Sequence, residues 1–291
     1  MIITSIKGGL GNQLFQYACG RAAAASHNVP LKLDISAFPD HNGRVFQLKH
    51  FNIRAKLANR LELNLFRYFI AKLPINAQKG IFSYTYLKEK EPCRYDPGIF
   101  QCHSNAYLSG YWQCYYYANV VRNILINEFK VLCPPDEQNE TFLNKISNQD
   151  SENAVAVHVR RGDYVTNATI NSHLGVCPLE YYQNAIAYFS SILRGPCFYV
   201  FSDDPEWAKK HLKQNGDRLT IIDHNQSTDG NIQDFRLMCA CTHFIISNST
   251  FSWWAAWLGQ AKNKQVVTPK RWFAAKNRND IELIPPEWKR L

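Results

Sequence analysis

The sequence has few of the features that hold small secreted or metal-bound folds together. Its nine cysteines are an odd number at irregular spacing, and no pair has the CxxC arrangement. Cys239, Cys241 and His243 have no second cluster to complete a metal site, and disulfide frameworks are typical of shorter secreted chains. We therefore interpret the cysteines as buried thiols of a reduced, cytoplasmic protein.

The sequence also lacks an apolar stretch near the roughly 20 residues that a membrane-spanning helix needs. Residues 1–7 have no basic start of the kind found in signal peptides, and Gly8, Gly9 and Gly11 interrupt the next segment. Repeats and low-complexity tracts are missing, and with 46% apolar residues disorder is excluded for most of the chain. We expect a cytoplasmic protein whose membrane contact, if any, is peripheral.

Positive charge is present in excess, with a formal net charge of +9. Residues 54–94 contain nine Lys or Arg and three Glu, a balance that favours nucleic acid, a membrane surface or phosphorylated ligands. A nucleic-acid-binding function is the weaker alternative, because the basic residues are dispersed and no binding motif is present. Apolar residues recur every four positions from Leu57 to Leu73. They predict a basic amphipathic helix packed on the domain, with peripheral membrane contact as the alternative.

The order of apolar segments predicts an α/β fold. A strand at residues 2–6, a glycine turn at 8–13, a helix at 14–25 and a strand at 31–34 open a Rossmann-like half. After a polar stretch at 144–153, strands and helices alternate to residue 268, which indicates a second parallel sheet. We predict Rossmann-like domains at residues 1–147 and 148–291, facing a central cleft. Ligands of such sheets bind beyond the carboxyl ends of the strands.

Two adjacent arginines, Arg160 and Arg161, follow the first strand of the second half. A guanidinium matches phosphate oxygens in a bidentate manner. Neighbouring residues on a strand point to opposite sides, so one arginine can face a ligand while the other pairs with an acid such as Asp163. The alternative is a purely structural ion pair.

Polar groups follow three other strands. Asp203 and Asp204 suit either a divalent metal or the cap of the next helix, and we favour the cap and a hydrogen-bonding role. The run from Ser249 to Ser252, at a helix start, suits either an anion site or an ordinary N-cap. The glycine turn after the first strand is a weaker signal. It offers Asn12 and Gln13 to a sugar or diphosphate.

Four segments resemble one known family: residues 8–18 (GGLGNQLFQYA), 158–164 (HVRRGDY), 201–204 (FSDD) and 248–258 (NSTFSWWAAWL). In this order, over nearly the whole chain, they are similar to bacterial α-1,2-fucosyltransferases of glycosyltransferase family 11. The resemblance implies a GT-B type fold, with an N-terminal acceptor-side domain and a C-terminal domain that binds GDP-fucose as co-substrate. It implies no metal or other cofactor.

The resemblance also implies residue roles. Arg160 would contact the β-phosphate, His158 and Asp234 would lie near the guanine, and Asn12 would reach in from the other domain. The catalytic candidates are Arg160, Asn12, Asp163 and Asp34, the last because it ends the second strand on the presumed acceptor side; no general base is assigned. The donor-binding candidates are His158, Arg161, Asp203, Asp234, Ser249, Thr250, Phe251, Ser252, Gly11 and Gln13.

The implied reaction is an inverting transfer of L-fucose from GDP-β-L-fucose to the 2-hydroxyl of a terminal β-galactose. The acceptor would be an oligosaccharide such as an O-antigen repeat, free or lipid-linked. Arg160 and the helix start at Ser249 would stabilise the charge on the departing GDP. A different GDP-hexose donor and a non-catalytic glycan-binding module remain as alternatives.

Overall fold

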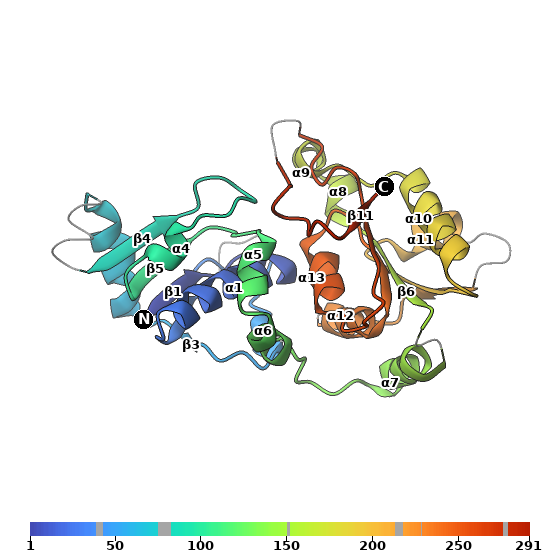
Figure 1. Ribbon diagram of the computed structural model, residues 1–291, viewed down its shortest axis with the longest axis horizontal. Coiled ribbons are helices and arrows are strands. Elements are labelled where there is room, and N and C mark those ends of the chain that lie inside the picture. The colour runs from blue at the N-terminus through green and yellow to red at the C-terminus, as the bar shows by residue number, and fades with distance from the viewer. Residues whose placement is uncertain (39–42, 75–82, 150–151, 213–217, 228, 276–278) are drawn as a thin grey trace. The chain divides into compact units, whose positions relative to one another are not determined.

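The computed structural model describes residues 1–38, 43–74, 83–149, 152–212, 218–227, 229–275 and 279–291 (Figure 1). The chain forms two compact units. The first unit contains Met1–Leu132 and Ile281–Pro285, and the second contains Cys133–Asp280 and Pro286–Leu291.

The division therefore falls earlier than the predicted boundary at residue 147. Helix α7 (Glu137–Asn144) and the π-helical turn η5 (Lys145–Gln149) belong to the second unit. Asn139 of α7 is buried and bonds to Asn225 at 2.8 Å, and Ile146 is buried as well. The polar stretch that begins at residue 144 therefore starts inside the second unit and does not separate the two units. One buried isoleucine among polar residues is too weak a pattern to predict this packed turn from the sequence.

A parallel sheet of five strands forms the centre of the first unit, in the order β3-β2-β1-β5-β4. The strands are β1 (Ile2–Ser5), β2 (Leu31–Asp34), β3 (Lys56–Leu57), β4 (Tyr84–Lys88) and β5 (Asn105–Ser109). The other elements are α1 (Leu10–Ser26), η2 (Leu48–His50), α2 (Arg60–Asn64), η3 (Leu65–Phe69), η4 (Ile70–Lys72), α4 (Gly98–Gln101), α5 (Tyr115–Val120) and α6 (Arg122–Glu128).

Helix α1 begins four residues earlier than expected, so Gly11, Asn12 and Gln13 lie in its first turn rather than in a loop. The helix packs closely on the sheet, since a Cβ at Gly20 would come within 2.9 Å of the Thr4 and Leu31 side chains. Only a glycine permits this approach, and Figure 1 shows α1 beside β1.

The segment at residues 54–73 is not one amphipathic helix. It contains β3 followed by α2, the π-helical η3 and the 3-10 turn η4. Asn59 and Glu62 form a capping box that starts α2 at Arg60, so the residues before it are free to join the sheet edge. Phe66 and Ile70 are buried against Ile3 and Tyr107, as expected of a segment packed on its domain.

The second unit has a parallel sheet of six strands in the order β11-β10-β9-β6-β7-β8. The strands are β6 (Ala154–Val159), β7 (Cys197–Ser202), β8 (Arg218–Ile222), β9 (His243–Ile245), β10 (Val266–Thr268) and β11 (Lys289–Arg290). The remaining helices are α8 (Gly162–Thr166), α9 (Ala168–Leu174), α10 (Leu179–Ile192), α11 (Pro205–His211), α12 (Gly230–Ala240) and α13 (Thr250–Leu258). The predicted alternation after residue 154 is confirmed.

The core of the second unit lies around β6, whose six residues are all buried. Trp253, Trp254 and Trp257 of α13 are buried as predicted, and α12 packs beside α13 (Figure 1). Two α/β units with parallel sheets confirm the GT-B type of two Rossmann-like domains. The cleft between them stays a prediction.

Candidate active site

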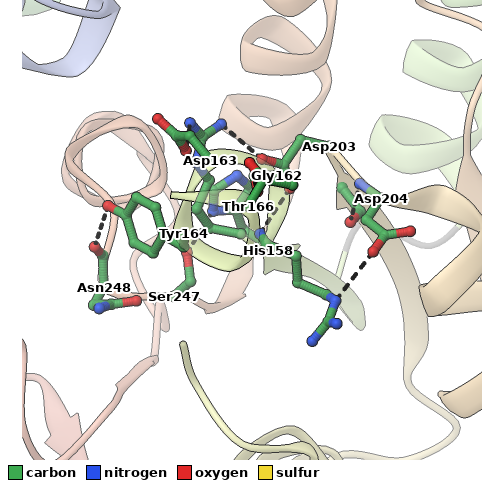
Figure 2. A network of polar contacts seen from close by, with 12 residues as sticks. His158, Gly162, Asp163, Tyr164, Thr166, Asp203, Asp204, Ser247 and Asn248 are labelled. Carbon is green, nitrogen blue, oxygen red and sulfur yellow. Dashed lines mark hydrogen bonds and ion pairs between the residues drawn. The ribbon is translucent and has the colours of Figure 1, made fainter. Parts of the chain in front are cut away.

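The two arginines after β6 are each held by carboxylates (Figure 2). Arg160 pairs with Asp163 through Nη2 and with Asp203 through Nη1, the latter at 2.9 Å. Arg161 donates from Nε to Asp204 at 3.1 Å, and its guanidinium lies 4.3 Å from the ring centre of Trp207. As predicted, Arg160 and Arg161 have different partners. Asp163, the acid proposed from the sequence, pairs with Arg160.

Asp203 links the two arginines. One of its carboxylate oxygens pairs with Arg160, and the other accepts the backbone N–H of Arg161 at 2.8 Å. A Cβ at Gly162 would lie 2.5 Å from the Asp203 carboxylate, so only glycine fits between Arg161 and Asp163.

These ion pairs show that both arginines have a structural role. Arg160 can nevertheless still bind a ligand. A guanidinium carries five N–H donors in a planar fork, and two carboxylates do not use all of them. The Arg160 side chain is 23% exposed. The two carboxylates fix its orientation, and a phosphate oxygen can reach donors that remain.

Asp204 is the N-cap of α11, where its side chain accepts the backbone N–H of Trp207 at 3.1 Å. The predicted cap is thus confirmed for Asp204, while Asp203 has the hydrogen-bonding role. No group of three or more His, Cys, Asp or Glu side chains in the described part of the chain is arranged to hold a metal ion.

His158 lies on β6 and is almost fully buried. Its Nδ1 is 2.8 Å from the Ser247 hydroxyl, and its ring centre is 5.5 Å from that of Phe251. Burial, aided by the nearby positive charge of Arg160, lowers the pKa of His158 to about 3. The imidazole is therefore neutral at physiological pH and too weakly basic to be a good proton acceptor.

The start of α13 follows β9 closely. Ser249 is the N-cap residue and its side chain makes no capping hydrogen bond. The start of a helix is a favourable place for an anion. Thr250 and Phe251 are half-buried. Ser252 differs from the prediction: it is fully buried and its hydroxyl donates to the Ser249 carbonyl at 3.2 Å, so it supports the turn and does not face a ligand.

Asp234 lies on α12 in a network of amides. Asn225 donates to its Oδ1 at 2.8 Å, and Asn225 in turn bonds to Asn139. Burial raises the pKa of Asp234 from 3.8 to about 7. A ring contact between Phe235 and Phe251, 5.4 Å between centres, connects α12 to the residue that packs on His158.

In the first unit, Asn12 accepts a hydrogen bond from Gln113 at 2.8 Å. Gln13 is fully buried and bonds to the carbonyls of Gly8 and Val45, so it supports the backbone and is not placed to bind a donor. Gly11 is also buried. The structure thus argues against the predicted roles of Gly11 and Gln13, because the helix that begins at Leu10 turns both inward.

Asp34 is likewise placed for structure. It is 2% exposed, and it accepts hydrogen bonds from the backbone of Ser36 at 3.0 Å and from the hydroxyl of Tyr107 at 2.5 Å. Arg67 lies 3.7 Å away. With both carboxylate oxygens hydrogen-bonded inside the unit, Asp34 is not placed to contact an acceptor, and this conformation argues against its predicted catalytic role.

The sequence model of glycosyl transferase family 11 matches residues 1–291. The chain belongs to glycosyl transferase family 11. It is therefore a glycosyltransferase, and the resemblance drawn from its four segments is confirmed.

Two relatives of this family 11 enzyme come from Escherichia coli. The alpha-1,2-colitosyltransferase is 30% identical, over 100% of this chain and 99% of its own. The O-antigen biosynthesis glycosyltransferase WbnK is 29% identical, over 96% of this chain and 97% of its own. The solved structure of an Arabidopsis thaliana FUT1 mutant in complex with GDP shares the fold, with a TM-score of 0.52 at 11% identity, covering 98% of this chain and 75% of that one.

Three residues that lie in or beside the four segments were given no role from the sequence, yet they also shape this site: Ser247, Asn248 and Tyr164. Ser247 and Asn248 follow β9, where Asn248 donates to the carbonyls of Leu174, Gly175 and Trp272. Tyr164 donates to the Asn248 carbonyl at 3.2 Å (Figure 2). Two polar residues directly after a strongly apolar strand were the available signal.

All nine cysteines of the enzyme are free, and seven are buried, as expected of thiols that serve as apolar groups. In the regions that the structure describes, none of the helices has the length and apolar character required to span a bilayer.

Proposed function

We propose that this enzyme transfers L-fucose from GDP-β-L-fucose to the 2-hydroxyl of a terminal β-galactose, with inversion at the sugar. The observation that carries the proposal is the placement of Arg160. It lies at the carboxyl end of β6, fixed by Asp163 and Asp203. In parallel sheets this edge is where nucleotides bind.

Arg160 and the start of α13 supply the charge that the reaction needs. Negative charge grows on GDP as the bond to the sugar breaks, and a cation already held in place stabilises it without reorganisation. The start of α13, after Ser249, is a second place where negative charge is favoured. With these groups the proposal needs no metal and no other cofactor.

Guanine recognition is assigned to Asp234. Guanine presents two adjacent N–H donors, and an ionised carboxylate accepts both. Because its pKa is about 7, Asp234 is mostly ionised, and so able to accept both hydrogen bonds, only above neutral pH in the unliganded enzyme. The GDP in the solved relative of similar fold is in keeping with a guanine nucleotide donor.

The alternative donor is GDP-colitose, favoured by the 30% identical colitosyltransferase. Colitose is the 3-deoxy form of fucose, so one hydroxyl separates the two donors. The name of that relative also supports a 1,2 linkage, and WbnK supports an O-antigen acceptor.

A donor panel decides between them. The enzyme is incubated with lactose or Gal-β-1,3-GlcNAc and with GDP-fucose, GDP-colitose or GDP-mannose, and GDP release and product linkage are measured. We expect GDP-fucose to be consumed and an α-1,2-fucoside to form. Turnover of GDP-colitose alone would overturn the donor assignment, and no turnover with any donor together with no GDP binding would overturn the function.

We further propose that the enzyme works at the cytoplasmic membrane surface on a lipid-linked acceptor. Leu61, Tyr68 and Phe69 are 80%, 63% and 48% exposed, which is unusual for such side chains. The same stretch of sequence carries five exposed basic residues: Arg54, Lys56, Arg60, Arg67 and Lys72. The acid in this segment, Glu62, pairs with Lys32, so the surface keeps a positive charge that suits anionic lipid.

A further inference from the structure

A cavity of about 370 Å³ lies in the first unit, at the carboxyl ends of β4 and β5. This volume is within the range of roughly 300–1,000 Å³ found for small-molecule sites. None of the sequence motifs includes its residues. They are Glu89, Lys90, Glu91, Arg94, Tyr95, Asp96, Pro97, Trp112 and Glu282.

The walls of the cavity are fixed by hydrogen bonds between its segments. The Glu89 carboxylate, directly after β4, accepts the backbone N–H groups of Tyr111 at 2.8 Å and Trp112 at 2.9 Å, both after β5. The Glu282 carboxylate accepts the backbone N–H of Tyr95 at 2.7 Å. Three stretches of chain are thus held around one space before any ligand binds.

The charge of the lining argues against a nucleotide. Four carboxylates face one lysine and one arginine in a chain whose formal net charge is +9. A diphosphate would be repelled. Carboxylates accept hydrogen bonds from hydroxyl groups, so a neutral ligand rich in hydroxyls fits this lining.

Two aromatic residues complete the cavity. Tyr95 is partly exposed, and its ring can cover the C–H face of a sugar. Trp112 is buried and adopts a positive φ of 54°, so its indole is a fixed part of the cavity wall.

We infer that this cavity binds the terminal sugar of the glycan acceptor, an inference that rests on the proposed transferase function. Its wall is joined to the glycine-rich segment, because Gln113, next to Trp112, donates to Asn12 at 2.8 Å. The ends of β1, β4 and β5 therefore form one continuous polar edge. Asn12 is placed at the side of the acceptor in this arrangement.

The test compares two side chains of similar exposure. Tyr95 lines the cavity and is 39% exposed, while Ile192 of the second unit is 44% exposed and does not line it. We expect Tyr95→Ala to raise the KM for lactose or Gal-β-1,3-GlcNAc about tenfold or more and to leave the KM for the GDP-sugar within about twofold. Ile192→Ala should keep both constants. An unchanged acceptor KM in Tyr95→Ala would overturn the inference while transfer itself stands.

A binding measurement separates this inference from the proposed reaction. Saturation-transfer NMR with lactose is recorded for the wild type, Tyr95→Ala and Ile192→Ala, without a nucleotide. We expect galactose signals with the wild type and Ile192→Ala and their loss with Tyr95→Ala, even if every GDP-sugar fails to react. No signal with the wild type, or the same signal with Tyr95→Ala, would refute glycan binding in this cavity.

Discussion

The half-buried carboxylate of Asp234 makes the stability of the second unit depend on pH. Its pKa rises from 3.8 to about 7 on folding, because burial penalises the ionised form. The unfolded chain therefore ionises first, and stability falls as pH rises from about 4 through 7. Linkage with these values gives a loss of about 2.5 kcal/mol between pH 5 and pH 8.

Asp234→Asn removes this titration and keeps the hydrogen bond from Asn225, whose Nδ2 can still donate to the side-chain oxygen. We expect the free energy of unfolding of the variant, relative to that of the wild type, to increase by about 2.5 kcal/mol as the pH is raised from 5 to 8. Six of the seven tryptophans lie in the second unit, so urea unfolding followed by tryptophan fluorescence reports on it. The exposed Glu287 supplies the control, and Glu287→Gln should follow the wild type at both pH values. A difference in the free energy of unfolding between the wild type and Asp234→Asn that stays the same at both pH values would refute the reasoning.

The same variant tests the guanine assignment. Hydrogen bonds to a charged group contribute about 1.5–3 kcal/mol, so Asp234→Asn should weaken GDP binding roughly 10- to 100-fold. Titration calorimetry at pH 8 measures this, and the wild-type affinity should fall as the pH is lowered below 7. Equal GDP affinity in both proteins would remove Asp234 from the nucleotide site.

Two further predictions concern charge at other places. Arg160→Ala should lower kcat/KM at least about 100-fold, because the departing GDP loses its fixed cation. Arg160→Lys should restore only part of this activity. If GDP-release kinetics of Arg160→Ala stay within about threefold of the wild type, the phosphate role is contradicted. Replacing Leu61 and Phe69 together by Glu should abolish co-sedimentation with vesicles that contain phosphatidylglycerol and leave turnover of a soluble acceptor unchanged. The surface proposal would be contradicted if the wild type sedimented equally with phosphatidylglycerol vesicles and with neutral phosphatidylcholine vesicles, or if it sedimented with neither.

The fold was largely predictable because its signals are local. Buried parallel strands such as residues 154–159 are continuous apolar runs, and the helices between them have their own start signals. The tandem arginines, with Asp163 as a partner and Asp204 as a helix cap, also follow from neighbours in sequence. Each of these features is decided within a few residues of the chain.

The failures concern contacts between distant segments. Gln13 and Asp34 looked available in the sequence, but packing against Val45 and Tyr107 turns both inward. Nothing near Trp112 in sequence indicates that Glu89 and Glu282 meet it around a cavity. A pattern of residue types does not encode which buried polar groups find partners across a sheet.

The path of the last residues has a consequence for how the enzyme can be divided. The chain enters the second unit at Cys133, returns to the first at Ile281–Pro285 and ends in the second, where β11 pairs with β10. Leu283 and Ile284 are buried, and Glu282 is part of the cavity. A fragment cut at residue 132 would lose all three, and the remaining fragment would expose two apolar side chains. The units are thus separate in packing but not separable by a single cut, and a shortened C-terminus would damage both at once.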